Sequence, residues 1–129
     1  MRRFTQVDVF TDELTFGNPV AVVHDADRAA DAGRFTAVGV VGPHPPGSEV
    51  AFEVRAFMPL EGQGEDPVTG SLNAALGQWL IGTGRAPSSY VAAQGTALGR
   101  RGRVYVTKVD DDVWVGGDTV TGVTGMVHR

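Results

Sequence analysis

The stretch SLNAALGQWLIG, residues 71–82, is the segment of this 129-residue chain whose apolar side chains follow a helical period. Those side chains fall at positions i, i+3, i+4, i+7 and i+8 and so share one face of a helix. They are Leu72, Ala75, Leu76, Trp79 and Leu80. Gly82 and Gly84 follow, and glycine commonly ends a helix. We therefore predict one helix here, with this face directed toward a core.

Short strands are predicted on both sides of the helix. Residues 50–59 alternate apolar with other side chains, which places Val50, Phe52, Val54, Ala56 and Met58 on one face. Other runs rich in valine and aromatic residues predict strands at residues 4–10, 19–24, 35–42, 88–95, 102–109, 111–117 and 119–127. An acidic turn at residues 110–112 predicts a hairpin between the runs that flank it.

One helix among about eight short strands, without alternation of strand and helix, argues against a parallel doubly wound fold. We predict an α+β protein in which a curled, mostly antiparallel sheet wraps around one central helix. Residues 1–129 are long enough for one domain with its own core, and too short for two comfortable ones. The stretch at residues 25–34 has no core-facing stripe and predicts either one weak helical turn or a linker.

Composition excludes several classes of function. The net charge of -4 gives no general attraction to nucleic acid or to anionic membranes. The absence of cysteine excludes disulfides, thiolate metal sites and a cysteine nucleophile, and the three scattered histidines predict no metal site. No window predicts a signal peptide or a membrane span, so we expect a cytoplasmic protein. Arg100, Arg101 and Arg103 are interpreted as a solvated loop.

The stretch GEDPVTGS, residues 64–71, lies directly before the predicted helix, at the end of a longer predicted loop, residues 60–70. One interpretation is structural, because Thr69 or Ser71 could cap the helix by accepting a hydrogen bond from a first-turn N–H group. The other is functional, because Gly70 leaves room for an anion, such as a substrate carboxylate, at the helix N-terminus. Asp66 would then lie beside that anion as a proton donor or acceptor.

Several blocks of the sequence occur together in a recognisable order. They are VDVFTDELTFGNPVAVVHDAD, FEVRAFMPLEGQGEDPVTGSLNAALGQWL, and QGTALGRRGRVYV followed by VWVGGDTVTGVTGMV. In these blocks the chain resembles the PhzF-like family of phenazine biosynthesis. The resemblance implies a fold similar to diaminopimelate epimerase, with two related lobes, each a curled sheet around a helix, facing each other across the active site. It also implies chemistry without a cofactor, including isomerisation by proton transfer at carbon.

The resemblance further implies functional residues. Asp66 corresponds to an acid/base residue or a partner of a substrate hydroxyl group. The residues implied to bind substrate are Thr69, Gly70 and Ser71 at the helix start, and Gly17 and Asn18 in the lining of the cleft.

Compared with that family the chain is short, and the missing part falls between residues 25 and 34. Residues 1–25 then correspond to an N-terminal hairpin and residues 34–129 to the family's C-terminal lobe. The missing part carries the family's catalytic glutamate and a glycine-histidine-proline motif. His44, in GPHPPG, is interpreted as a loop histidine rather than as a substitute for that motif.

A homodimer would complete such a half-cleft, because a two-fold axis would bring two helix starts and two Asp66 side chains together. Two nearby carboxylates in a partly dry cleft cannot both ionise easily, so one would serve as acid and the other as base. We therefore expect a homodimeric, cofactor-independent, isomerase-type enzyme acting on a small carboxylate. The alternative is a non-catalytic small-molecule-binding or relic protein that keeps the fold and the anion pocket.

Overall fold

The computed structural model describes residues 4–9, 18–23, 37–58 and 64–127. Within these residues the chain forms eight strands, one α-helix and one short 3-10 helix. In chain order they are β1 (Phe4–Val9), β2 (Asn18–Val23), β3 (Val38–Pro43), β4 (Phe52–Met58), β5 (Gly64–Asp66), α1 (Gly70–Gly82), β6 (Ser89–Gln94), η2 (Thr96–Leu98), β7 (Gly102–Val109) and β8 (Asp112–Gly116).

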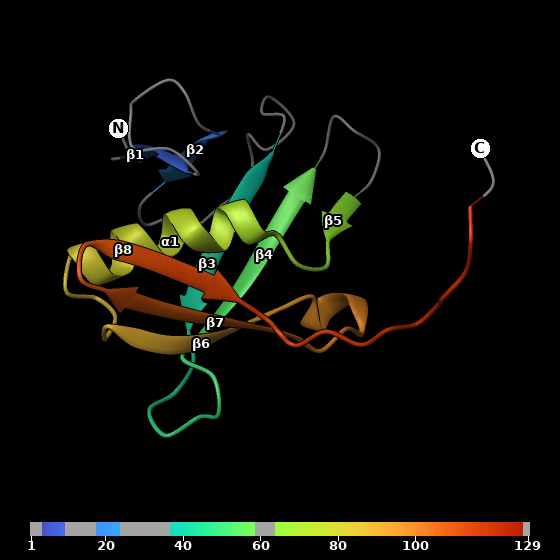
Figure 1. The fold of residues 1–129 in the computed structure, drawn as a ribbon. Helices are drawn as coiled ribbons and strands as arrows, with labels where there is room; N and C mark the ends of the chain where they lie inside the picture. The colour runs from blue at the N-terminus through green and yellow to red at the C-terminus, as the bar shows by residue number, and fades with distance from the viewer. Residues whose placement is uncertain (1–3, 10–17, 24–36, 59–63, 128–129) are drawn as a thin grey trace.

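Six of the strands form one open sheet around α1 (Figure 1). Its order is β3-β4-β6-β7-β8, and β5 adds to β4 beside this path. The β4–β6 pair is parallel, and the other pairs of this sheet are antiparallel. β1 and β2 pair antiparallel in a separate two-stranded sheet that contacts α1. The predicted α+β class, a mostly antiparallel sheet around one helix, is therefore confirmed.

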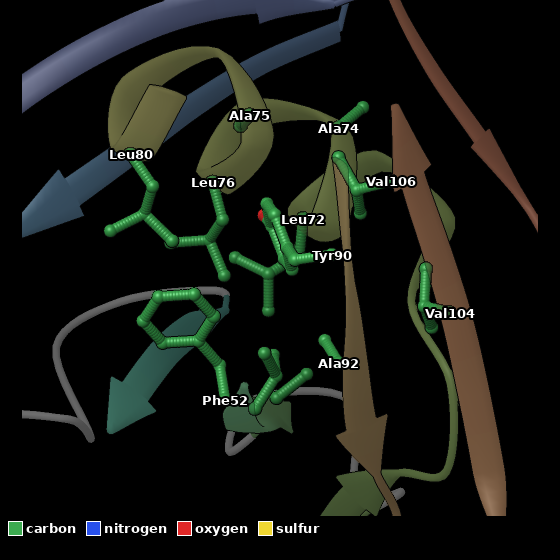
Figure 2. Close-up of a cluster of buried hydrophobic side chains, with 12 residues drawn as sticks. Phe52, Leu72, Ala74, Ala75, Leu76, Leu80, Tyr90, Ala92, Val104 and Val106 are labelled. Carbon is green, nitrogen blue, oxygen red and sulfur yellow. The ribbon is translucent and has the colours of Figure 1, made fainter. Parts of the chain in front are cut away.

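The core lies between α1 and the sheet, where alternate residues of the strands meet the helix. On β4 the predicted alternation is confirmed: Phe52, Val54 and Ala56 are buried, while the residues between them are half-buried. Figure 2 shows the side chains of α1 directed at those of β4, β6 and β7. The cluster is Phe52, Val54, Ala56, Leu72, Ala74, Ala75, Leu76, Leu80, Tyr90, Ala92, Val104 and Val106.

The helix is buried over more of its surface than the predicted stripe. Leu72 through Gly77 are all buried, while Trp79, predicted as a core residue, is only partly so. Gly77 explains how the helix lies so close to the sheet, because a Cβ there would lie 2.8 Å from Val106 and 2.9 Å from Val113. The helix ends at Gly82 as predicted, and Gly84 takes a left-handed φ of 70° just beyond it.

Two predictions about the strands were wrong. Residues 119–127 were predicted as a strand, but they form no regular structure and run away from the sheet (Figure 1). Their valines and methionine are more than 90% exposed. The loop predicted at residues 60–70 instead contains β5, whose last residue is Asp66. The predicted hairpin is confirmed, with a turn of Asp110 and Asp111 only, because Asp112 already pairs with Val109 in β8. The stretch at residues 25–34 lies outside the described residues.

Candidate functional site

The candidate site forms where two strands share one edge of β4. β6 pairs with the first part of β4, so that Gln94 lies opposite Val54. β5 pairs with the last part, so that Asp66 lies opposite Ala56. Val54 and Ala56 are two residues apart and are both buried on the helix side of the sheet. Asp66 and Gln94 therefore lie close together on that same side, beside the start of α1.

Gln94 has no exposed surface and makes four hydrogen bonds, three with the segment before the helix and one with Asn73 of α1. Its Nε2 donates to the main-chain oxygen of Asp66 at 3.0 Å and to Thr69 Oγ1 at 3.0 Å. Its Oε1 accepts from the N–H of Thr69 at 3.1 Å and from Asn73 Nδ2 at 2.8 Å. An amide has two donor hydrogens and two acceptor lone pairs, so this side chain is fully satisfied.

The Asp66 carboxylate is held by Thr69. Thr69 Oγ1 donates to Asp66 Oδ2 at 2.7 Å. Asn73, which is also buried, joins this arrangement to the helix because its Nδ2 donates to the main-chain oxygen of Thr69 at 2.9 Å. Asp66 and Thr69 are themselves half-buried, so the carboxylate is ordered by the protein and still reachable from outside.

The helix start differs from the predicted cap. Thr69 is the N-cap residue, but neither its side chain nor that of Ser71 caps the helix. The physical reason is competition, because the Thr69 hydroxyl is already committed to Asp66 and Gln94. The first N–H groups of α1 are thus left without a side-chain cap. A Cβ placed on the exposed Gly70 would meet no described atom within 4 Å, so space is open at this end of the helix.

Gly95 and Gly102 pack closely against Pro67 and Val68, the two residues between Asp66 and Thr69. A Cβ on Gly95 would lie 2.7 Å from the main-chain oxygen of Pro67, and Gly95 also takes a left-handed φ of 86°. A Cβ on Gly102 would lie 2.5 Å from Val68. Only glycine satisfies both demands at position 95, since it has no side chain and tolerates positive φ.

Charged residues next to the site face the other side of the sheet. Glu65 is 7% exposed in its side chain and forms a bidentate pair with Arg55, with distances of 2.9 and 2.7 Å. His44 Nε2 lies 3.3 Å from Glu53 Oε2, so the predicted loop histidine is half-buried and in hydrogen-bond contact with a carboxylate. These glutamates point away from α1 because β4 alternates, and they are not neighbours of Asp66 on the helix side.

The Arg55–Glu65 pair predicts a specific loss of stability in acid. The hydrogen bonds from Arg55 hold the pKa of Glu65 below its ordinary value of 4.5, against the opposing effect of burial. A pKa that is lower in the folded state stabilises the fold above about pH 4.5, and this contribution disappears as the pH falls through the native pKa. Urea unfolding of the wild type and Glu65→Gln should therefore give free energies whose difference is constant near neutrality and shrinks in acid.

Glu49→Gln is the matched control for that experiment. The Glu49 side chain is exposed, and its contact with Arg103 is long at 3.8 Å. A wild-type advantage over Glu65→Gln that does not change between pH 7 and pH 3 would contradict the predicted role of the pair.

The remaining predicted residues are placed as follows. Asn18 begins β2, where its backbone lies opposite Val9, and Gly17 lies outside the described residues. Arg100 and Arg101 are exposed as predicted and line a surface hollow with Glu49, Thr96 and Arg103. In the part of the chain that the structure describes, no group of three or more histidine or acidic side chains could hold a metal ion. No helix in these ranges is long and apolar enough to span a bilayer.

Sequence analysis did not identify Gln94 and Asn73. Both carry a detectable signal, because each is a polar residue inside an apolar run: Asn73 follows Leu72 on the helix, and Gln94 ends the run YVAAQ. A buried polar group must find a hydrogen-bond partner. Two such residues in neighbouring elements indicate a buried polar contact, although the sequence does not identify which atoms meet.

Within the described residues, the fold and this junction define an α+β protein whose buried amides converge on the start of the central α-helix. The family described as phenazine biosynthesis-like protein, PhzC-PhzF, matches residues 33–125, and this chain belongs to that family. An uncharacterized isomerase of Deinococcus radiodurans is 39% identical over 87 residues. That similarity covers 64% of this chain but only 28% of the relative, so the chain corresponds to a minor part of that protein.

Proposed function

We propose that this protein is an isomerase-type enzyme that moves a proton at a carbon atom of a small carboxylate-bearing metabolite, without a cofactor. The observation that carries the proposal is the Asp66 carboxylate, held by Thr69 beside an uncapped helix start. Membership of the PhzC-PhzF family and similarity to a protein named as an isomerase support it.

In the proposed reaction each residue has a separate task. The uncapped N–H groups at Gly70 and Ser71 bind the substrate carboxylate, because a helix N-terminus favours negative charge. Asp66 takes the proton from the adjacent carbon atom or returns it. Thr69 orders Asp66, and Gly17 and Asn18 contribute to the lining of the cleft.

A second copy of the chain completes the cleft in this proposal. Proton transfer at carbon with return to the other face needs two acid/base groups, and Asp66 is one. The nearby Glu53 and Glu65 are paired on the opposite face of the sheet. A homodimer with two facing Asp66 side chains would supply the second group.

The alternative is a protein that binds small carboxylates without catalysis. Glu53 and Glu65 are engaged on the other face of the sheet, which favours this alternative. Binding at the helix N–H groups needs no second acid/base group, whereas a two-base reaction does. The two functions differ in one measurable property. Only the enzyme exchanges the substrate's carbon-bound hydrogen with solvent.

The test combines exchange and binding. We expect the wild type, incubated in deuterium oxide with a panel of small carboxylic acids, to incorporate deuterium at the carbon next to the carboxylate of at least one acid. Acetate should shift the amide resonances of Gly70 and Ser71, with chloride at equal ionic strength as the control. Gly70→Ala should weaken this acetate binding while stabilising the fold by about 0.4–1 kcal/mol, since its Cβ meets no described atom.

Each outcome separates the hypotheses. Binding without exchange would support the alternative function, and neither binding nor exchange would contradict both. Sedimentation of the same samples tests the dimer, and a strict monomer at high concentration would remove the two-fold cleft.

A further inference from the structure

Gln94 is oriented by the main chain alone. The N–H of Thr69 can only donate, so it must face Gln94 Oε1, and the carbonyl of Asp66 can only accept, so it must face Nε2. In a flipped amide, Nε2 would face the Thr69 N–H and Oε1 would face the Asp66 carbonyl, so both hydrogen bonds would be lost. Since Asn73 also donates to Oε1, three independent groups require the same orientation.

The orientation of Gln94 in turn determines where the Thr69 hydroxyl directs its proton. Gln94 Nε2 donates to Thr69 Oγ1, so the hydroxyl acts as acceptor on that side. A hydroxyl has one proton, and the remaining partner of Thr69 Oγ1 is Asp66 Oδ2 at 2.7 Å. Thr69 therefore donates to Oδ2. Among the described residues none donates to Asp66 Oδ1.

We propose that Gln94 is a positioning residue, which acts through Thr69 to hold the Asp66 carboxylate in one rotamer with Oδ2 occupied and Oδ1 free to exchange the proton. The proposal rests on the proposed function of Asp66. It extends that function because it assigns different roles to Oδ1 and Oδ2 of Asp66. It also assigns the orientation of this carboxylate to Gln94, which is fully buried and so out of reach of a substrate. Gln94 is suited to this task because it is fully buried and has no unused hydrogen-bonding group.

Three substitutions test the chain of contacts. Thr69→Val keeps the shape of the side chain and removes the hydroxyl, and Thr69→Ser keeps the hydroxyl. Gln94→Met removes all four hydrogen bonds of the amide. Thr107→Val is the matched control, because it removes from β7 a threonine hydroxyl that lies 3.0 Å from Ser89 Oγ, on an exposed part of the sheet.

The first measurement is independent of any substrate. Three-bond couplings between the Asp66 carboxyl carbon and its backbone report whether the side chain occupies one rotamer. We expect single-rotamer couplings in the wild type, Thr69→Ser and Thr107→Val, and averaged couplings in Thr69→Val and Gln94→Met. Single-rotamer couplings in Thr69→Val would overturn the proposal, even if Gln94→Met does not fold.

The second measurement is deuterium exchange into an acid that the wild type turns over. Thr69→Val should lower kcat between about tenfold and a hundredfold, with KM unchanged, because a displaced base reacts poorly while the carboxylate site at the helix start is intact. Thr69→Ser should restore most of the rate. If Thr69→Ser does not restore the rate, and the loss of kcat in Thr69→Val simply follows its loss of stability, Thr69 and Gln94 have a purely structural role and the proposal is overturned. If the wild type exchanges no acid, the proposed function fails while the couplings still decide the positioning of Asp66.

Discussion

Asp66→Asn is expected to lower the rate of solvent-deuterium exchange by about 10²–10⁴-fold, which is the usual contribution of a positioned acid or base. Asparagine has nearly the same shape, and its amide oxygen can still accept the hydrogen bond from Thr69. The substitution thus removes the ability to carry a proton and keeps the contact that orders the side chain. The measurement is mass-spectrometric detection of deuterium in an acid that the wild type exchanges.

Asp118→Asn is the matched control for this experiment. Asp118 also accepts a hydrogen bond from a hydroxyl, that of Tyr105 at 3.0 Å, but it is exposed and follows β8. The control should exchange at the wild-type rate. Acetate binding at Gly70 and Ser71 should survive in Asp66→Asn, because the helix N–H groups are unchanged. Full exchange activity in Asp66→Asn would show that another group carries the proton.

Leu76→Ala is expected to lower the free energy of unfolding by about 2–5 kcal/mol. Leu76 is 3% exposed and lies in the middle of α1, where Figure 2 shows it within the cluster that includes Phe52. Truncation removes apolar contacts and leaves a cavity between helix and sheet. Domains of this size are commonly stable by only about 5–15 kcal/mol, so the loss is a large share of the total. Urea unfolding at neutral pH measures it.

Leu98→Ala provides the comparison for that prediction. Leu98 is 43% exposed in η2, so the same substitution removes little buried surface there. We expect its effect to stay within about 0.5 kcal/mol, as for most surface changes. A loss in Leu76→Ala no greater than that in Leu98→Ala would contradict the assignment of the core.

Strands with a partner close in the sequence were predicted well. β7 and β8 are joined by a two-residue turn at Asp110 and Asp111, so each strand finds its partner next to it in the sequence. Residues 119–127 carry similar valines and threonines but form no strand. Propensity for extended structure is weak without a neighbouring strand to satisfy the backbone. The presence or absence of a neighbouring strand therefore explains why a similar composition predicted β8 correctly and residues 119–127 wrongly.

In the candidate site, too, local features were predicted from the sequence and contacts between distant residues were not. The acid, the glycine and the helix start were recognisable in the stretch GEDPVTGS, because a helix boundary and its neighbouring side chains are local features. The expectation that Thr69 or Ser71 caps the helix failed for a reason outside the stretch. Gln94, more than twenty residues away in the sequence, engages Thr69 and so directs its hydroxyl to Asp66.

The sequence by itself determined the α+β class, the helix α1 with Leu72 and Leu76 on its buried face, and the alternation of β4. These features follow from the 3.6-residue and two-residue periods, which are properties of neighbouring residues. Only the tertiary structure decided that β5 and β6 share one edge of β4. That arrangement places Gln94 within hydrogen-bond distance of Asp66 and Thr69. No local period specifies it, because strand pairing across many residues depends on how the whole sheet packs against α1.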